Sequence, residues 1–123
     1  MTEKDFLNVY STQLIAFVNL YKDELENISN ESSQIIRDKI YNHTVLIIEK
    51  GNLLVTDILF KNGIDSDTPV TASDLSEATL SSVLAHKTFS IQIKVKKDYD
   101  KFSESILSEA LCRDFPEDCL EDL

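Results

Sequence analysis

The chain has 123 residues, of which 42% are hydrophobic and 28% are charged, and its formal net charge at pH 7 is −10. This composition excludes an intrinsically disordered chain and predicts one globular domain over residues 1–123, and the acidity argues against direct binding to nucleic-acid phosphates. Only two glycines are present, which argues against the glycine-rich loops that bind nucleotides or stabilise oxyanions.

Residues 3–27 have the pattern of an amphipathic helix. Thr2 is a suitable N-cap, because an acidic residue follows it three positions later. Apolar side chains recur at intervals of three and four residues, as they do on one face of a helix. These residues are Leu7, Tyr10, Leu14, Phe17 and Tyr21. Because further apolar residues widen this face, we predict that these five bind a protein partner or a second copy of the chain.

A polar stretch at residues 27–33 predicts a break after this helix. Ser29 or Asn30 can cap a second helix over residues 31–42. The pattern leaves open whether one bent helix or two separate helices precede residue 42. We define residues 1–42 as a helical segment that carries the expected partner surface.

Residues 44–60 are predicted to form a β-hairpin. Two runs rich in β-branched residues, 44–50 and 53–60, flank Gly51 and Asn52, which fit a type II′ turn. Both runs are apolar on both faces, so we expect helices to cover each side of the hairpin.

The C-terminal half is predicted to contain a loop at 64–71, a helix at about 74–86, a strand at 88–96 and a helix at about 99–111. The strand assignment depends on strict alternation of apolar and polar residues. Lys94 and Lys96 would share its polar face. They belong to a basic patch suited to an acidic peptide or a phosphate, unless their role is to protect an edge strand from aggregation.

These elements, in the order α-α-β-β-α-β-α, predict an α+β fold with a small, mainly antiparallel sheet and helices packed on it. Residues 43–111 would form the α/β core. Residues 112–123 would form an acidic C-terminal tail, and its residues 114–123 would contribute little to folding.

The sequence contains none of the common catalytic or phosphate-binding motifs. His43 is interpreted as a turn residue, and Cys112 and Cys119 as ordinary thiols. The spacing of cysteines and histidines does not suit a zinc site, and the acidic residues at 65–67 lack the further ligands of a calcium loop. We therefore expect no enzyme activity, no metal and no cofactor.

The predicted function is that of a non-catalytic protein-interaction module, such as a small subunit or adaptor of a multiprotein complex. The alternative is an acidic inhibitor (an immunity protein, an antitoxin or a nucleic-acid mimic) that binds a basic cleft of its target. The acidic N-terminus does not resemble a targeting signal, and no apolar run is long enough to cross a membrane. We therefore expect an intracellular protein of the cytoplasm or nucleus, not a secreted one.

Overall fold

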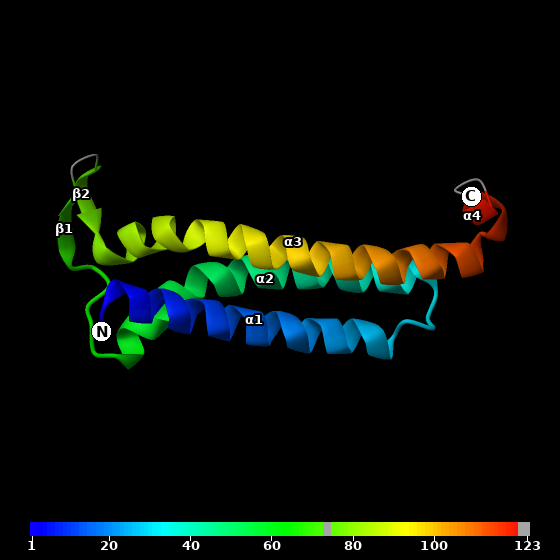
Figure 1. Ribbon diagram of the computed structural model, residues 1–123, viewed down its shortest axis with the longest axis horizontal. Helices are drawn as coiled ribbons and strands as arrows, with labels where there is room; N and C mark the ends of the chain where they lie inside the picture. Colours follow the sequence, from blue (N-terminus) through cyan, green and yellow to red (C-terminus); the bar gives the residue numbers. More distant parts are fainter. Residues whose placement is uncertain (73–74, 121–123) are drawn as a thin grey trace.

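The computed structural model describes the backbone of residues 1–72 and 75–120, with the side chains of residues 1–69, 79–117 and 119. Three long helices lie side by side: α1 (Glu3–Asn27), α2 (Ser33–Lys61) and α3 (Leu80–Asp114), as Figure 1 shows. The chain reverses direction between α1 and α2 and again between α2 and α3. Each long helix packs against the other two. The domain is therefore a three-helix bundle.

Two short elements lie at opposite ends of the bundle (Figure 1). Strands β1 (Pro69–Ala72) and β2 (Leu75–Thr79) pair as an antiparallel ribbon in the connection between α2 and α3. The five-residue helix α4 (Pro116–Leu120) follows α3 at the other end. The ribbon is peripheral to the bundle, so the predicted α+β fold is wrong and the protein is all-α.

The predicted hairpin at 44–60 is the second half of α2. Its β-branched residues favour strands only weakly, because packing overrides β-propensity. One face of α2 supplies Ile47, Leu54, Val55 and Ile58 to the core, at the spacing of a helix. The run looks apolar on both faces because the opposite side of α2 also carries exposed apolar residues.

Gly51 lies inside α2 rather than in a turn. A Cβ atom built on it would meet the side chain of Gln92 on α3 at 2.7 Å. The carbonyl of Gly51 also accepts a hydrogen bond from the hydroxyl of Tyr10 on α1, at 2.8 Å. Glycine therefore permits close packing of the three helices at this level, and the assignment as a turn residue was wrong.

The strand predicted at 88–96 and the helix predicted at 99–111 belong to one helix, α3, together with residues 80–86 of the helix predicted at 74–86, whereas residues 75–79 of that predicted helix form β2. Thr79 caps α3, whereas residue 74, where the first of these helices was predicted to begin, lies outside the described residues. Of the alternating apolar residues, Val95 is buried, whereas Phe89 and Ile93 are exposed. The apolar–polar alternation in the sequence includes Phe89 and Ile93, which face outward on α3 and do not follow the spacing of its core residues.

The first helix is confirmed. Thr2 caps α1 and forms a capping box with Asp5, in which each side chain binds the other residue's backbone N–H. The break also exists, although Ser32 is the N-cap of α2. Residues 3–42 therefore belong to two helices.

Apolar side chains from all three long helices form one core. Its largest fully buried members are Tyr10, Leu14, Leu25, Ile36, Ile47, Ile58, Leu59 and Tyr99.

The end of α3 is tied to the loop between α1 and α2. The carboxylate of Asp114 accepts a hydrogen bond from the backbone N–H of Ser33 at 2.6 Å, at the start of α2. The guanidinium of Arg113 donates to the carbonyls of Ser29 and Glu31. The acidic tail predicted from residue 112 onward thus begins inside the fold.

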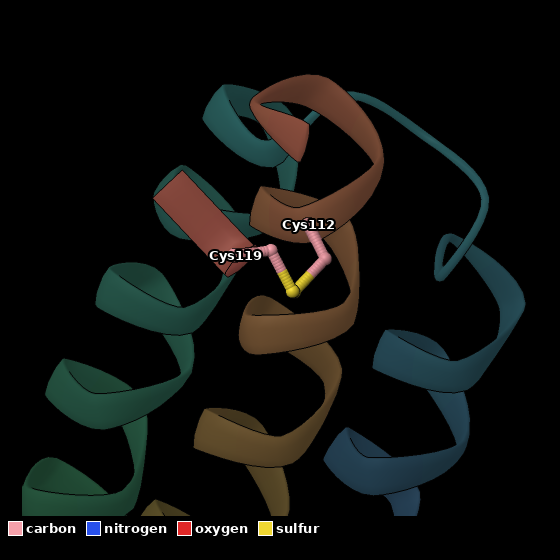
Figure 2. Close-up of a disulfide and its surroundings, with 2 residues drawn as sticks. All are labelled: Cys112 and Cys119. Atoms are coloured by element: carbon pink, nitrogen blue, oxygen red, sulfur yellow. A yellow bond between two sulfur atoms is a disulfide. The ribbon is translucent and has the colours of Figure 1, made fainter. Parts of the chain in front are cut away.

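A disulfide joins Cys112 on α3 to Cys119 on α4 (Figure 2). The two Cα atoms are 4.9 Å apart, within the range that a disulfide can span. The prediction of two ordinary thiols was therefore wrong. Pro116 ends α3 and turns the chain so that Cys119 comes back to Cys112.

Candidate functional site

A polar cluster lies inside the bundle, at the level of His43 on α2. The imidazole Nδ1 is 2.7 Å from the hydroxyl of Tyr99 on α3, and Nε2 is 3.1 Å from the carboxylate of Glu24 on α1. Lys39 binds the other oxygen of Glu24 at 2.9 Å. The ring of Tyr21 stacks on the imidazole, with the centroids 4.9 Å apart. The cluster thus joins all three helices.

The surroundings of His43 favour the neutral ring. Burial lowers the pKa of His43, and the hydrogen bond and charge of Glu24 oppose this effect only partly. The hydrogen bond from Lys39 holds the pKa of Glu24 below its ordinary value. A neutral imidazole then donates from Nε2 to Glu24 and accepts at Nδ1 from Tyr99. Every member of the cluster has a partner.

This arrangement resembles an acid–base relay in its residue types, but the bundle encloses its imidazole and its phenol, and only the carboxylate of Glu24 at the outer end is 51% exposed. His43 is 1% exposed and Tyr99 is fully buried. A catalytic base must reach the proton that it removes, directly or through one water. We assign the cluster a structural role: it fixes the register of the three helices, because any slip would leave buried polar atoms without partners.

The predicted partner-binding residues on α1 contribute mostly to the core. Tyr10 and Leu14 are fully buried, and Leu7, Phe17 and Tyr21 are half-buried against the core. In the folded monomer, a partner has no access to the side chains of Tyr10 and Leu14. Partner binding by the other three residues stays a prediction.

Phe60, Tyr41 and Leu53 are the three most exposed large apolar side chains among the described residues, and they belong to two rows on α2. The first row contains Leu46, Leu53 and Phe60, at intervals of seven residues, so that they lie on one side of the helix. Leu53 is 63% exposed and Phe60 is 82% exposed. We call these three residues the heptad row.

Leu53 and Phe60 of the heptad row border a groove between α1 and α2. Phe17, Lys50, Leu53, Asp57 and Phe60 are among the residues that line this groove, which has a volume of about 550 Å³. The ammonium group of Lys50 lies 4.7 Å from the centre of the Phe17 ring. Asp57 forms an ion pair with Lys61, one turn later, at 3.0 Å. The groove therefore combines an apolar row with one cation and one anion.

The second row on α2 contains Tyr41, Val45 and Ile48, which are all exposed. It lies toward α3, because the side chain of Gln92 donates a hydrogen bond to the carbonyl of Ile48 at 3.3 Å. Phe89, three residues before Gln92 on α3, is also exposed. We call Tyr41, Val45 and Ile48 the α3-side row.

The lysines predicted to share a strand face are not equivalent on the helix. Lys96 pairs with Asp100 within α3, at 3.0 Å. Lys94 is exposed and lines a shallow groove with Ser90, Lys97 and Lys101. Lys94, Lys97 and Lys101 form no ion pair with the described residues. The basic patch thus exists as a helix face, whereas its placement on a strand was wrong, and a role in partner binding stays a prediction.

Within the described part of the chain, no three histidine, cysteine or acidic residues are grouped so that they could hold a metal ion. Among the same residues, no helix has both the length and the apolar character that crossing a bilayer requires. The intracellular location stays a prediction. The disulfide argues against an intracellular location, because such bonds persist mainly in oxidising compartments.

No protein-family model, curated protein or solved structure matches this chain. The function must therefore be argued from its own residues.

Sequence reasoning missed both the heptad row and the role of His43. The seven-residue spacing of Leu46, Leu53 and Phe60 was present in the sequence, but it fell within residues assigned to a hairpin. His43 was assigned to a turn for the same reason. A long helix predicted over residues 33–61 would have revealed the heptad row, because its three residues lie away from the core-facing side of that helix.

Proposed function

We propose that this protein is a non-catalytic interaction module, a small subunit or adaptor that binds other protein chains through α2. The observation that carries the proposal is the set of exposed apolar side chains on this helix. Tyr41, Leu53 and Phe60 are 70%, 63% and 82% exposed, respectively. Large apolar side chains that are exposed in rows on one helix are typical of interaction sites, because leaving them in water is unfavourable.

Two features support binding rather than catalysis. The imidazole of His43 is buried, and both of its nitrogens already have hydrogen-bond partners within the bundle. The exposed rows contain the aromatic side chains of Tyr41 and Phe60, and aromatic residues are enriched at protein interfaces. The bundle gives these side chains a rigid support, because the opposite side of α2 is locked into the core.

Affinity capture from the native host tests the proposal. The bait proteins are the wild type, Leu53→Ser/Phe60→Ser, Tyr41→Ser/Phe89→Ser and the control Asn52→Ser. Asn52 is an exposed polar residue of the same helix. We expect a protein that is retained by the wild type and the control and is lost with one of the double variants.

Salt separates this function from the alternative of an acidic inhibitor. Apolar association should survive about 1 M salt, whereas charge-driven binding to a basic cleft should weaken steeply, because ions screen it. A partner that is bound equally by all four baits, and that is released by salt, would contradict the interaction role of α2 and favour the inhibitor.

A further inference from the structure

We propose that the heptad row is a homodimer interface, in which α2 of a second copy packs antiparallel against α2 around a twofold axis close to Leu53. This inference rests on the proposed function, since it names the occupant of one of the two rows on α2. It follows from the symmetry of the row, from the placement of its charges and from its degree of exposure.

The row is symmetric about its central residue. Leu46 and Phe60 lie seven residues before and after Leu53. In a twofold dimer the same patch occurs on both subunits, so the patch must complement itself. An antiparallel α2 pair centred on Leu53 places Leu53 against its own copy and Leu46 against Phe60 of the other copy. The contact then extends over roughly 21 Å of helix, from the 1.5 Å rise per residue.

The charges beside the row are complementary under the same symmetry. Lys50 and Asp57 both line the groove on the α1 side of the row. The twofold axis keeps both residues on that side and reverses the direction of the helix. Lys50 then lies about 1.5 Å along the helix axis from Asp57 of the other copy, and Asp57 lies at the same separation from the other Lys50. Two equivalent ion pairs would flank the Leu53 contact.

The side chains of the heptad row are also accessible to a second copy in the monomer. Leu46, Leu53 and Phe60 are all exposed, whereas Leu54, Val55 and Ile58, which alternate with them along α2, are buried. The row is therefore not needed to close the core. Because each subunit carries a net charge of −10, repulsion opposes pairing, and added salt should strengthen the dimer by screening that repulsion.

Site-specific cross-linking tests the axis position. Leu53→Cys should give a covalent dimer under mild oxidation, because the axis brings residue 53 next to its own copy. Leu46→Cys should not, because Leu46 faces Phe60, and Tyr41→Cys serves as the control on the other side of α2. Equal cross-linking of all three variants, or none for Leu53→Cys, would overturn the proposed interface.

A charge exchange tests the pairing independently of folding. Sedimentation analysis should show that Lys50→Asp and Asp57→Lys each weaken the dimer at least tenfold, because like charges then face each other. The double variant Lys50→Asp/Asp57→Lys should recover association, since it restores both pairs in the opposite sense. Circular dichroism confirms that each variant is folded.

The outcomes separate this inference from the broader function. A wild-type protein that stays monomeric at high concentration, together with a captured partner that requires the heptad row, would overturn the homodimer and keep the interaction module. A dimer that the double exchange does not restore would overturn this geometry.

Discussion

The inside of the bundle near His43 and the outside of α2 contrast in an unexpected way. The interior level contains a buried imidazole and a buried phenol joined by a hydrogen bond, and the imidazole also binds the half-exposed carboxylate of Glu24. The outer side of the same helix exposes leucine and phenylalanine. The buried polar groups act on folding, because they cannot lose a partner without penalty, whereas the exposed apolar groups are free to act on association.

The largest effect should come from the interior. We predict that His43→Leu lowers the free energy of unfolding by about 3 kcal/mol, because the Tyr99 hydroxyl loses its partner inside the core and Glu24 loses one of its two partners. Urea denaturation followed by circular dichroism measures this loss. Tyr41→Leu, on the exposed side of α2, is the matched control and should change stability by less than about 0.5 kcal/mol. Equal losses of unfolding free energy in His43→Leu and Tyr41→Leu would contradict the proposed difference between the interior and the outer side of α2.

Acid should also lower the free energy of unfolding through His43, but by less than the substitution His43→Leu does. In the folded protein burial lowers the pKa of His43, whereas the unfolded chain takes up its proton near the ordinary value of about 6.5. The unfolded state therefore binds more protons at low pH. The stability from the neutral ring is fully present above about pH 6.5 and is lost as the pH falls toward the lower folded pKa.

The groups that face His43 are Glu24 and Tyr21 on α1, Lys39 on α2 and Tyr99 on α3. The lowered pKa of Glu24 adds stability that is present above its ordinary pKa, near pH 4.5, and is lost in stronger acid. Urea denaturation at several pH values should show a slope between pH 7 and 5 that is reduced in His43→Gln. An equal slope in both proteins would show that His43 does not control this transition.

A smaller effect on stability should appear at Gly51, which packs closely against the side chain of Gln92. Gly51→Ala should lower stability by about 1 kcal/mol, because its new methyl group displaces Gln92 and breaks the hydrogen bond to Ile48. In a Gln92→Ala background the same change should raise stability by up to about 1 kcal/mol, since alanine favours a helix more than glycine does. A double-mutant cycle measures this coupling, and additive effects would contradict it.

The sequence predicted α1 well because its local signals agree. A capping box begins the helix, and its core residues repeat at three and four. In α2 and α3 the local signals conflict. β-Branched runs, an internal Gly-Asn pair and outward-facing Phe89 and Ile93 imitate strands, and only contacts between the helices decide the outcome. The histidine cluster and the disulfide depend on residues far apart or on chain reversal, so sequence spacing could not reveal them.

The central claim is that the heptad row serves association and not folding. Sedimentation equilibrium and urea denaturation, performed on the same samples of wild type and Leu53→Ser/Phe60→Ser, test it most directly. We predict a wild-type mass that rises toward twice that of the monomer with concentration, a variant that stays monomeric, and unfolding free energies of the monomers within about 1 kcal/mol of each other. Equal masses for the two proteins, or a variant destabilised by several kcal/mol, would contradict the account.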